Sequence, residues 1–245
     1  MTGETNPLDR IGIVLVAPRN PLNIGAVARA MANFGFQQLS VVAPFEAHWS
    51  EARSAVGAQQ VLGNARETRT LEEALAASTM VFGTGTINRR QPEQPVVLLP
   101  DLAPIVREEI ARGGRVALVF GPEKHGLIRE DLARCHRLLV IPTDARQPSM
   151  NLGQAVAVCL YELAARLGET LPPAPPADTP VTQAEIERLA AVAGEVMEAA
   201  RYSPAAMRAA NRHDLQLLLR RLNLNHSDAR RILGILRRIL HRLRV

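Results

Sequence analysis

The sequence predicts an α/β protein built on a parallel sheet, and three observations support this prediction. Ile11–Ala17 is a continuous apolar run followed by turn residues, which is typical of a strand buried on both faces. Similar short apolar runs alternate with segments of helical periodicity as far as residue 167. The composition, 47% hydrophobic and 22% charged, is that of a folded globular chain.

The elements follow in order from their patterns. The further predicted strands are short and apolar: Leu39–Ala43, Met80–Gly83, Val116–Phe120 and Leu138–Ile141. The predicted helices have apolar residues at helical spacing: Ile24–Phe34, Leu71–Ala77, Leu102–Ala111, Glu130–Arg134 and Asn151–Leu167. Glu46–Arg69 is less regular. Ile87–Pro100 is polar and contains prolines, so we expect an exposed loop there.

The composition changes after this α/β region. Leu171–Pro180 (LPPAPPADTP) has the composition of a stiff, extended linker. Three helix-like segments follow without a strand candidate: Gln183–Ala200, Pro204–Leu222 and Asp228–Leu243. We therefore expect a body of residues 1–168, a proline-rich linker of residues 169–182 and a helical extension of residues 183–245.

The positive charge is concentrated in this extension. The whole chain carries +5, whereas residues 201–245 hold eleven arginines opposed only by Asp214 and Asp228, a net charge of +9. A basic tail on a slightly acidic body favours contact with a polyanion such as nucleic acid. The alternative is a solvated helix face in a chain that prefers arginine, since Lys124 is its only lysine.

Other classes of protein receive little support. No apolar run approaches the roughly 20 residues that span a bilayer, and the first residues lack a signal-peptide pattern, so we expect a cytoplasmic protein without a membrane segment. Cys135 and Cys159 lie in apolar patterns and are predicted to be buried free thiols, with no metal site.

Three polar constellations follow predicted strands. Asn23 and Gly25 lie in the predicted loop Pro18–Gly25, where they allow a tight turn from strand to helix, and Arg29 lies about one helical turn further on. Gly121 and Glu123 follow the strand Val116–Phe120, at the edge of the sheet where α/β proteins bind ligands.

The third constellation, Ser149-Met150-Asn151, opens the helix that ends at Leu167. Each group has a structural alternative: a surface arginine for Arg29, and helix caps for Glu123, Ser149 and Asn151. No G-x-G-x-x-G, Walker A or G-x-S-x-G motif is present, which argues against dinucleotide binding, nucleotide hydrolysis and a serine hydrolase.

The three constellations, in this order and after these strands, resemble the motifs of the SPOUT superfamily of RNA methyltransferases, in its SpoU/TrmH branch. The resemblance covers about Ile11–Leu167. The tail around residues 212–240 resembles the C-terminal extension of the TrmJ group, which methylates tRNA in the anticodon loop. Met150 stands where leucine is commoner, a volume-conserving difference.

The resemblance implies a parallel-sheet SPOUT fold with a C-terminal trefoil knot, a homodimer and the cofactor S-adenosylmethionine. The cofactor-binding residues that it implies lie in four loops: Thr84, Gly85, Thr86, Gly121, Glu123, Ile141, Pro142, Ser149, Met150 and Asn151. The catalytic residues that it implies are Arg29, Asn23, Glu123, Ser149 and Asn151. Arginine does not deprotonate near neutral pH, so we expect Arg29 to orient the phosphate and the 2′-hydroxyl.

The expected function is S-adenosylmethionine-dependent 2′-O-ribose methylation of tRNA, with RNA and a second copy of the chain as partners. The alternatives are a ribosomal RNA 2′-O-methyltransferase, a non-catalytic RNA-binding protein of the same fold, and a regulatory protein whose tail binds acidic partners. The sequence does not identify the target nucleotide, the subunit on which the C-terminal helices pack, or a role for Asp144 and Arg146.

Overall fold

The chain forms a seven-stranded sheet with the order β3-β2-β1-β6-β4-β7-β5, in which every pair of neighbours is parallel. The computed structural model describes residues 6–45, 49–51, 54–86, 93–167 and 179–244. The strands are β1 (Ile11–Val16), β2 (Gln38–Val42), β3 (Arg66–Thr68), β4 (Met80–Thr84), β5 (Val96–Leu98), β6 (Val116–Phe120) and β7 (Arg137–Val140). The predicted parallel α/β fold is therefore confirmed.

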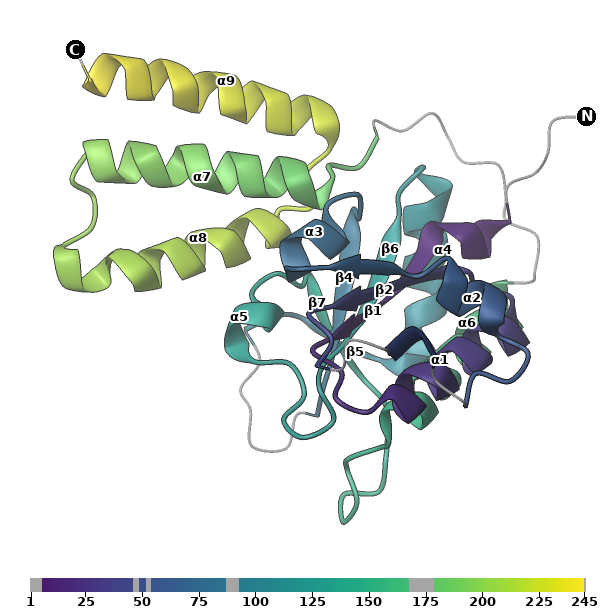
Figure 1. Ribbon diagram of the computed structural model, residues 1–245. Coiled ribbons are helices and arrows are strands. Elements are labelled where there is room, and N and C mark those ends of the chain that lie inside the picture. Colours follow the sequence, from purple (N-terminus) through teal and green to yellow (C-terminus); the bar gives the residue numbers. More distant parts are fainter. Residues whose placement is uncertain (1–5, 46–48, 52–53, 87–92, 168–178, 245) are drawn as a thin grey trace, which may run out of the picture.

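Helices cover both faces of the sheet (Figure 1). Those of the α/β body are α1 (Pro21–Phe34), α2 (Gln59–Gly63), α3 (Leu71–Leu75), α4 (Leu102–Ala111), α5 (Arg129–Leu132) and α6 (Leu152–Leu167). Alternate residues of β1 enter different cores: Ile13 and Leu15 pack with α1, α4 and α6, whereas Val14 packs with α3 and α5. This two-sided burial explains why β1 is apolar throughout.

Helix α1 begins three residues before the predicted start. Pro21 occupies the first turn, where its missing N–H costs nothing, and the Asn20 side chain accepts a hydrogen bond from the Leu22 amide at 2.9 Å. Gly35 ends the helix in the left-handed conformation (φ 81°), as its position after Phe34 indicated.

The prediction of an exposed loop over residues 87–100 was wrong in its second half. Residues 87–92 lie outside the described residues, but Val96–Leu98 forms the edge strand β5, paired with β7. Val97 is 6% exposed, whereas Val96 and Leu98 face solvent. The strand was missed because only one of its side chains points inward, so it has no clear alternation of buried and exposed residues. Prolines at residues 95 and 100 also lie close to its two ends.

Three helices form the C-terminal unit: α7 (Gln183–Ala199), α8 (Arg208–Arg221) and α9 (His226–Leu243). They share a small apolar core, which includes Ile186 and Leu219. Helix α7 is joined to the α/β body, because the amides of Gln183 and Ala184 donate to the carbonyls of Ser78 and Ala76 at 2.6 and 3.1 Å. Figure 1 shows the three helices side by side, projecting from the side of the sheet that carries α3 and α5.

The predicted linker lies mostly outside the described residues, which resume at Thr179. The division at residues 168 and 183, and the trefoil knot, therefore stay predictions. Both cysteines are buried as predicted, and burial raises the pKa of each thiol to about 12. Within the described ranges, no group of acidic, histidine or cysteine side chains could hold a metal ion, and no helix could cross a membrane.

His136 is a buried imidazole between the sheet and the C-terminal unit. Its Nδ1 accepts a hydrogen bond from the Val81 amide at 3.0 Å, and its own amide donates to the Val81 carbonyl at 2.9 Å. Burial, together with the charges of Arg220 and Arg137, lowers the pKa of His136 to about 3. The folded protein therefore holds His136 neutral.

We predict that His136 makes the protein sensitive to acid. In the unfolded chain His136 takes up a proton near the ordinary histidine pKa of about 6.5, whereas in the folded chain it stays neutral. Protonation therefore favours the unfolded state. Below a pH of about 6.5 the free energy of unfolding should fall by about 1.4 kcal/mol for each pH unit. His136→Asn retains an acceptor for the Val81 amide but cannot ionise. The free energy of unfolding is measured in urea at about pH 6.5 and at about pH 5. Between these two pH values it should fall by about 2 kcal/mol more for the wild type than for the variant. Equal losses would contradict the prediction.

Candidate functional site

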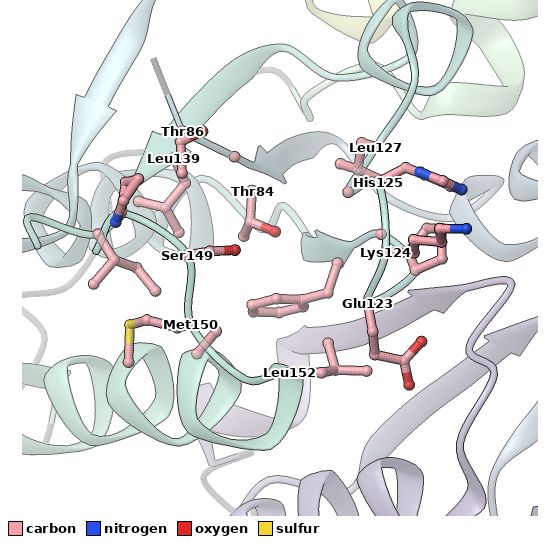
Figure 2. A pocket seen from close by; sticks show the side chains of 18 of the residues that line it. Thr84, Thr86, Glu123, Lys124, His125, Leu127, Leu139, Ser149, Met150 and Leu152 are labelled. Atoms are coloured by element: carbon pink, nitrogen blue, oxygen red, sulfur yellow. The ribbon is translucent and has the colours of Figure 1, made fainter. Parts of the chain in front are cut away.

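A pocket of about 230 Å³ lies at the carboxyl edge of the sheet. Its walls come from the segments that follow β4, β6 and β7, and from the start of α6. Parallel strands bring these segments together because their carboxyl ends lie at one edge. Figure 2 shows Lys124, His125 and Leu127 on one side of the pocket, with Ser149 and Met150 across from them.

The loop after β6 forms one wall by folding back on itself. A Cβ atom on Gly121 would lie 2.3 Å from the backbone of Gly126 and Leu127, so only glycine fits there. Gly126 completes the turn with a φ of +66°. The close neighbour that requires glycine at this position is therefore the backbone of the loop itself.

Glu123 joins this loop to the start of α1. Its carboxylate accepts hydrogen bonds from the backbone amides of Arg19 and Asn20, at 3.1 and 3.2 Å, and from the Asn23 side chain at 2.8 Å. These amides precede and open the helix, where donors lack intrahelical partners. Glu123 thus stabilises the amino-terminus of a helix from a loop about a hundred residues away.

Asn151 extends the same network to α6. Its Nδ2 donates to the Asn23 Oδ1 at 3.0 Å, while its Oδ1 accepts from the amides of Gly153 and Gln154 at 2.9 and 3.4 Å. It therefore caps α6 and also contacts the motif at the start of α1. The cap interpretation of Asn151 is confirmed, and its role in the site stays a prediction.

The network keeps the Glu123 carboxyl ionised. Partial burial acts to raise its pKa, but the hydrogen bonds from Asn23 and from the backbone of Arg19 and Asn20 outweigh burial, and the pKa lies below its ordinary value. The charge of Glu123 is thus already engaged by the protein. This carboxylate is better placed to hold the loop than to take up a proton during a reaction.

The structure brings together most of the residues predicted to bind a cofactor. Eight of the ten line the pocket: Thr84, Gly85, Thr86, Gly121, Glu123, Ile141, Ser149 and Met150. Pro142 and Asn151 are outside its lining, as are Asn23 and Arg29. Arg29 is exposed on α1, and no described hydrogen bond or ion pair joins it to the pocket or to the Glu123 network.

Sequence patterns missed the apolar walls and part of the rim. The additional walls are the ends of strands and the first turns of α6: Phe120, Leu127, Leu139, Leu152 and Ala155. Their sequence pattern is that of core residues, which hides their second role. Lys124 and His125 line the rim and could have been inferred from their place between Glu123 and Gly126.

The loop between β7 and α6 carries a self-contained ion pair. Asp144 accepts hydrogen bonds from the Arg146 amide at 2.8 Å and from its guanidinium at 3.0 and 2.8 Å. Both residues are exposed, and Figure 1 shows this loop projecting from the body. The pair lies in the turn between Thr143 and Pro148, two residues that line the pocket.

Known proteins share both the sequence and the architecture of this region. The profile of the SpoU rRNA Methylase family matches residues 10–161, more than half of the chain. A tRNA (cytidine/uridine/adenosine-2′-O-)-methyltransferase TrmJ of Pseudomonas aeruginosa is 43% identical over 157 residues, which are 64% of this chain and 61% of that protein. A tRNA (cytidine-2′-O-)-methyltransferase TrmJ of Methanocaldococcus jannaschii is 36% identical over 155 residues, 62% of this chain and 66% of that protein.

The crystal structure of TrmJ from Z. mobilis ZM4 is similar over 93% of this chain and 98% of that one, with a TM-score of 0.80 and 30% identity. A putative methylase family protein from Neisseria gonorrhoeae matches 78% of this chain and 97% of its own, with a TM-score of 0.68 and 31% identity. The aligned region spans less than two thirds of the first curated relatives. The α/β body, the pocket at its carboxyl edge and the match over residues 10–161 together show that the chain belongs to the SpoU rRNA Methylase family.

Proposed function

We propose that the protein transfers a methyl group from S-adenosylmethionine to a ribose 2′-hydroxyl of tRNA. The observation that carries this proposal is the pocket, because the loops after β4, β6 and β7 of a chain from a methylase family converge on it and carry eight of the ten residues expected to bind the cofactor. The TrmJ relatives, which are named as tRNA 2′-O-methyltransferases, support tRNA over ribosomal RNA as the substrate.

The lining of the pocket fits the cofactor. Side chains of Phe120, Leu139 and Ile141 offer apolar surface for an adenine ring, and the hydroxyls of Thr84 and Ser149 offer hydrogen bonds for a ribose or a carboxylate. When bound, S-adenosylmethionine supplies an electrophilic methyl group on a sulfonium. The chain then needs to align the 2′-hydroxyl with that methyl group, which is catalysis by orientation.

Arg29 is the residue that we propose for this orientation. It is exposed on α1 and lies outside the pocket lining of its own chain. Its planar guanidinium can hold a phosphate by two hydrogen bonds, and its permanent charge makes it unsuited to act as a base. We propose that Asn23, Glu123, Ser149 and Asn151 shape the site around the reacting groups.

We propose that Arg29 acts on the pocket of a second copy of the chain in a homodimer. Apolar side chains are exposed on α1 and α6: Leu22 is 55% exposed, Val158 38%, and Tyr161 60% although its ring meets that of Phe34 edge-on. Arg29 lies on α1, and Asn151 directly precedes α6 and caps it. A second copy packed on this surface would bury the apolar side chains and bring one chain's Arg29 towards the partner's pocket.

The C-terminal unit supplies the proposed RNA-binding surface. Exposed arginines follow the length of α9: Arg230, Arg231, Arg237, Arg238 and Arg242. A second cavity, of about 480 Å³, lies at the turn between α7 and α8 and contains Arg201, Arg208 and Arg212. We propose that these groups bind phosphates of the RNA. We further propose a cytoplasmic protein with the three-part division at residues 168 and 183.

A methylation assay tests the proposed function. Purified protein with labelled S-adenosylmethionine is incubated with total tRNA and, separately, with ribosomal RNA, and the modified nucleoside is identified by mass spectrometry. Methylation of a ribose in tRNA supports the proposal and also identifies the target nucleotide. Methylation of ribosomal RNA alone would identify ribosomal RNA, and not tRNA, as the substrate. Cofactor binding without methylation of either RNA would favour a non-catalytic RNA-binding protein.

Replacing Arg29 should slow methyl transfer strongly and leave cofactor binding nearly unchanged. Arg29→Ala should slow single-turnover transfer by roughly 100-fold or more, because an orienting group is lost. Cofactor affinity measured by calorimetry should stay near that of wild type, since Arg29 is outside the pocket lining. Arg29→Lys should restore little, because one ammonium lacks the planar pair of donors.

A mixing experiment tests whether each active site combines the pocket of one chain with Arg29 of the other. Arg29→Ala protein mixed with Gly121→Ala protein should recover activity, since a mixed dimer retains one site with an intact Arg29 and an intact pocket. The absence of recovery in verified mixed dimers would assign Arg29 to the pocket of its own chain, and a wild-type rate for Arg29→Ala would remove it from the site.

Asn151→Ala should weaken cofactor binding by loosening the entry to α6. Loss of the cap costs about 1 kcal/mol of stability, too little to unfold the chain. Asn225→Ala provides the matched control, because Asn225 caps α9 through a 2.7 Å bond to the Asp228 amide, away from the pocket. Calorimetry and thermal unfolding should show similar destabilisation in both variants, and reduced cofactor affinity only in Asn151→Ala. Equal affinities would limit Asn151 to capping.

The arginines of α9 should contribute to the salt dependence of RNA binding. Arg237→Gln/Arg238→Gln should reduce the slope of log affinity against log salt by about 1.5, since each lost phosphate contact removes about 0.7 to 0.9. The control, Arg112→Gln/Arg115→Gln, removes equal charge just before β6, at the edge of the sheet opposite the pocket. A wild-type slope for the α9 variant would identify these arginines as a solvated face.

A further inference from the structure

We propose that α8 positions the wall of the pocket through an ionic cluster of Glu93, Arg129 and His213. The cluster joins the C-terminal unit to the α/β body at the helix that follows the loop 121–127. The inference rests on the proposed function only in taking S-adenosylmethionine as the ligand of the pocket. It assigns the C-terminal unit a structural role in that site, in addition to its charge.

One carboxylate contacts both partners in the cluster. Glu93 Oε2 lies 2.7 Å from His213 Nε2, and Glu93 Oε1 lies 2.5 Å from Arg129 Nη2. His213 belongs to α8, Arg129 is the first residue of α5, and Glu93 precedes the edge strand β5. Three segments separated by 36 to 120 positions in sequence therefore meet at one side chain.

Helix α8 presents His213 to the body on a face that is otherwise buried. Leu217 and Arg220 follow His213 by four and seven residues, so the three side chains share one side of the helix. Leu217 is 9% exposed and Arg220 only 3%. Arg220 pairs with Glu187 of α7 and lies close enough to His136 to help lower the pKa of that imidazole. This buried anchor fixes the orientation of α8 in which His213 reaches Glu93.

The contacts continue from Glu93 to the pocket. Arg129 is two residues beyond Leu127, which lines the pocket and is fully buried. The neighbour of Glu93, Gln94, donates from its side chain to the Leu132 carbonyl at the end of α5, at 2.7 Å. Residues 93–94 therefore hold α5 at both ends. A shift of α8 would be transmitted through this segment to the loop that ends at Leu127.

The expected effect is moderate, because the cluster is only partly buried. The side chains of Glu93 and His213 are 35% and 20% exposed, so solvent screens part of their attraction. Partial burial acts to raise the pKa of Glu93, but hydrogen bonds and charge from His213 and Arg129 outweigh it and lower the pKa. The carboxylate therefore remains charged and accepts both partners.

The test compares two histidine–glutamate pairs of the C-terminal unit in the full-length chain. His213→Ala removes the pair that reaches the body. His226→Ala removes the pair with Glu185, 2.6 Å long, which joins α9 to α7 within the unit. His213→Gln keeps a donor near the position of Nε2 and serves as the rescue variant. Each protein is measured by calorimetry with S-adenosylmethionine and, without ligand, by hydrogen exchange of the amides of residues 121–129.

We expect His213→Ala to weaken cofactor affinity by about fivefold and to accelerate exchange in residues 121–129. His226→Ala should change neither, and His213→Gln should recover most of both. Unchanged exchange and affinity in His213→Ala, or equal changes in His226→Ala, would overturn the inference. Failure of the wild type to bind S-adenosylmethionine would instead refute the proposed function, while the exchange measurement would still decide the role of the cluster.

Discussion

The Glu123 carboxylate is the interaction on which the geometry of the pocket depends. It binds the start of α1, and through Asn23 it reaches Asn151 at the start of α6. Glu123 is exposed, so solvent screens these bonds, but all three meet on one carboxylate and join the loop after β6 to the start of α1. The same end of α6 approaches α1 closely, since a Cβ on Gly153 would lie 2.9 Å from the Cβ of Ala26.

This arrangement explains why three short motifs can define the site. The motifs lie in separate loops, but they meet because the parallel sheet places β1 and β6 side by side and β4 between β6 and β7. The charge of Glu123 is used to hold loops together, and the pocket itself is formed mainly of hydroxyls, backbone and apolar side chains. Such a lining suits a reaction that depends on alignment more than on proton transfer.

The sequence predicted most of the fold because burial leaves a strong pattern. Strands covered on both faces, such as β1 and β6, are apolar throughout, and the predicted bounds of β6 and α4 agree with the structure. The edge strand β5 was missed because a strand with one buried side chain has no clear periodicity. The start of α1 was predicted three residues beyond its true position, because Pro21 was assigned to a loop. Proline is in fact favoured in the first turn of a helix.

The site was predictable only in part. Eight of the ten proposed cofactor residues line the pocket, and they were predicted from the resemblance to a known family, which the motifs after the strands carry. Walls such as Phe120 and Leu139 were missed because a residue that lines a pocket from the core has the same pattern as any core residue. The contact between Glu93 and His213 has no signature in sequence, since it depends on how α8 packs 120 positions away.

One residue on the rim of the pocket is suited to chemical labelling. Lys124 is the only lysine in the chain, and it is exposed on the loop that forms one wall. Amine-directed reagents would therefore label one side chain, beside the pocket, in addition to the α-amino group of the chain. The protein carries its own reporter position, at which occupancy of the pocket and the approach of RNA could be followed by fluorescence without an engineered cysteine.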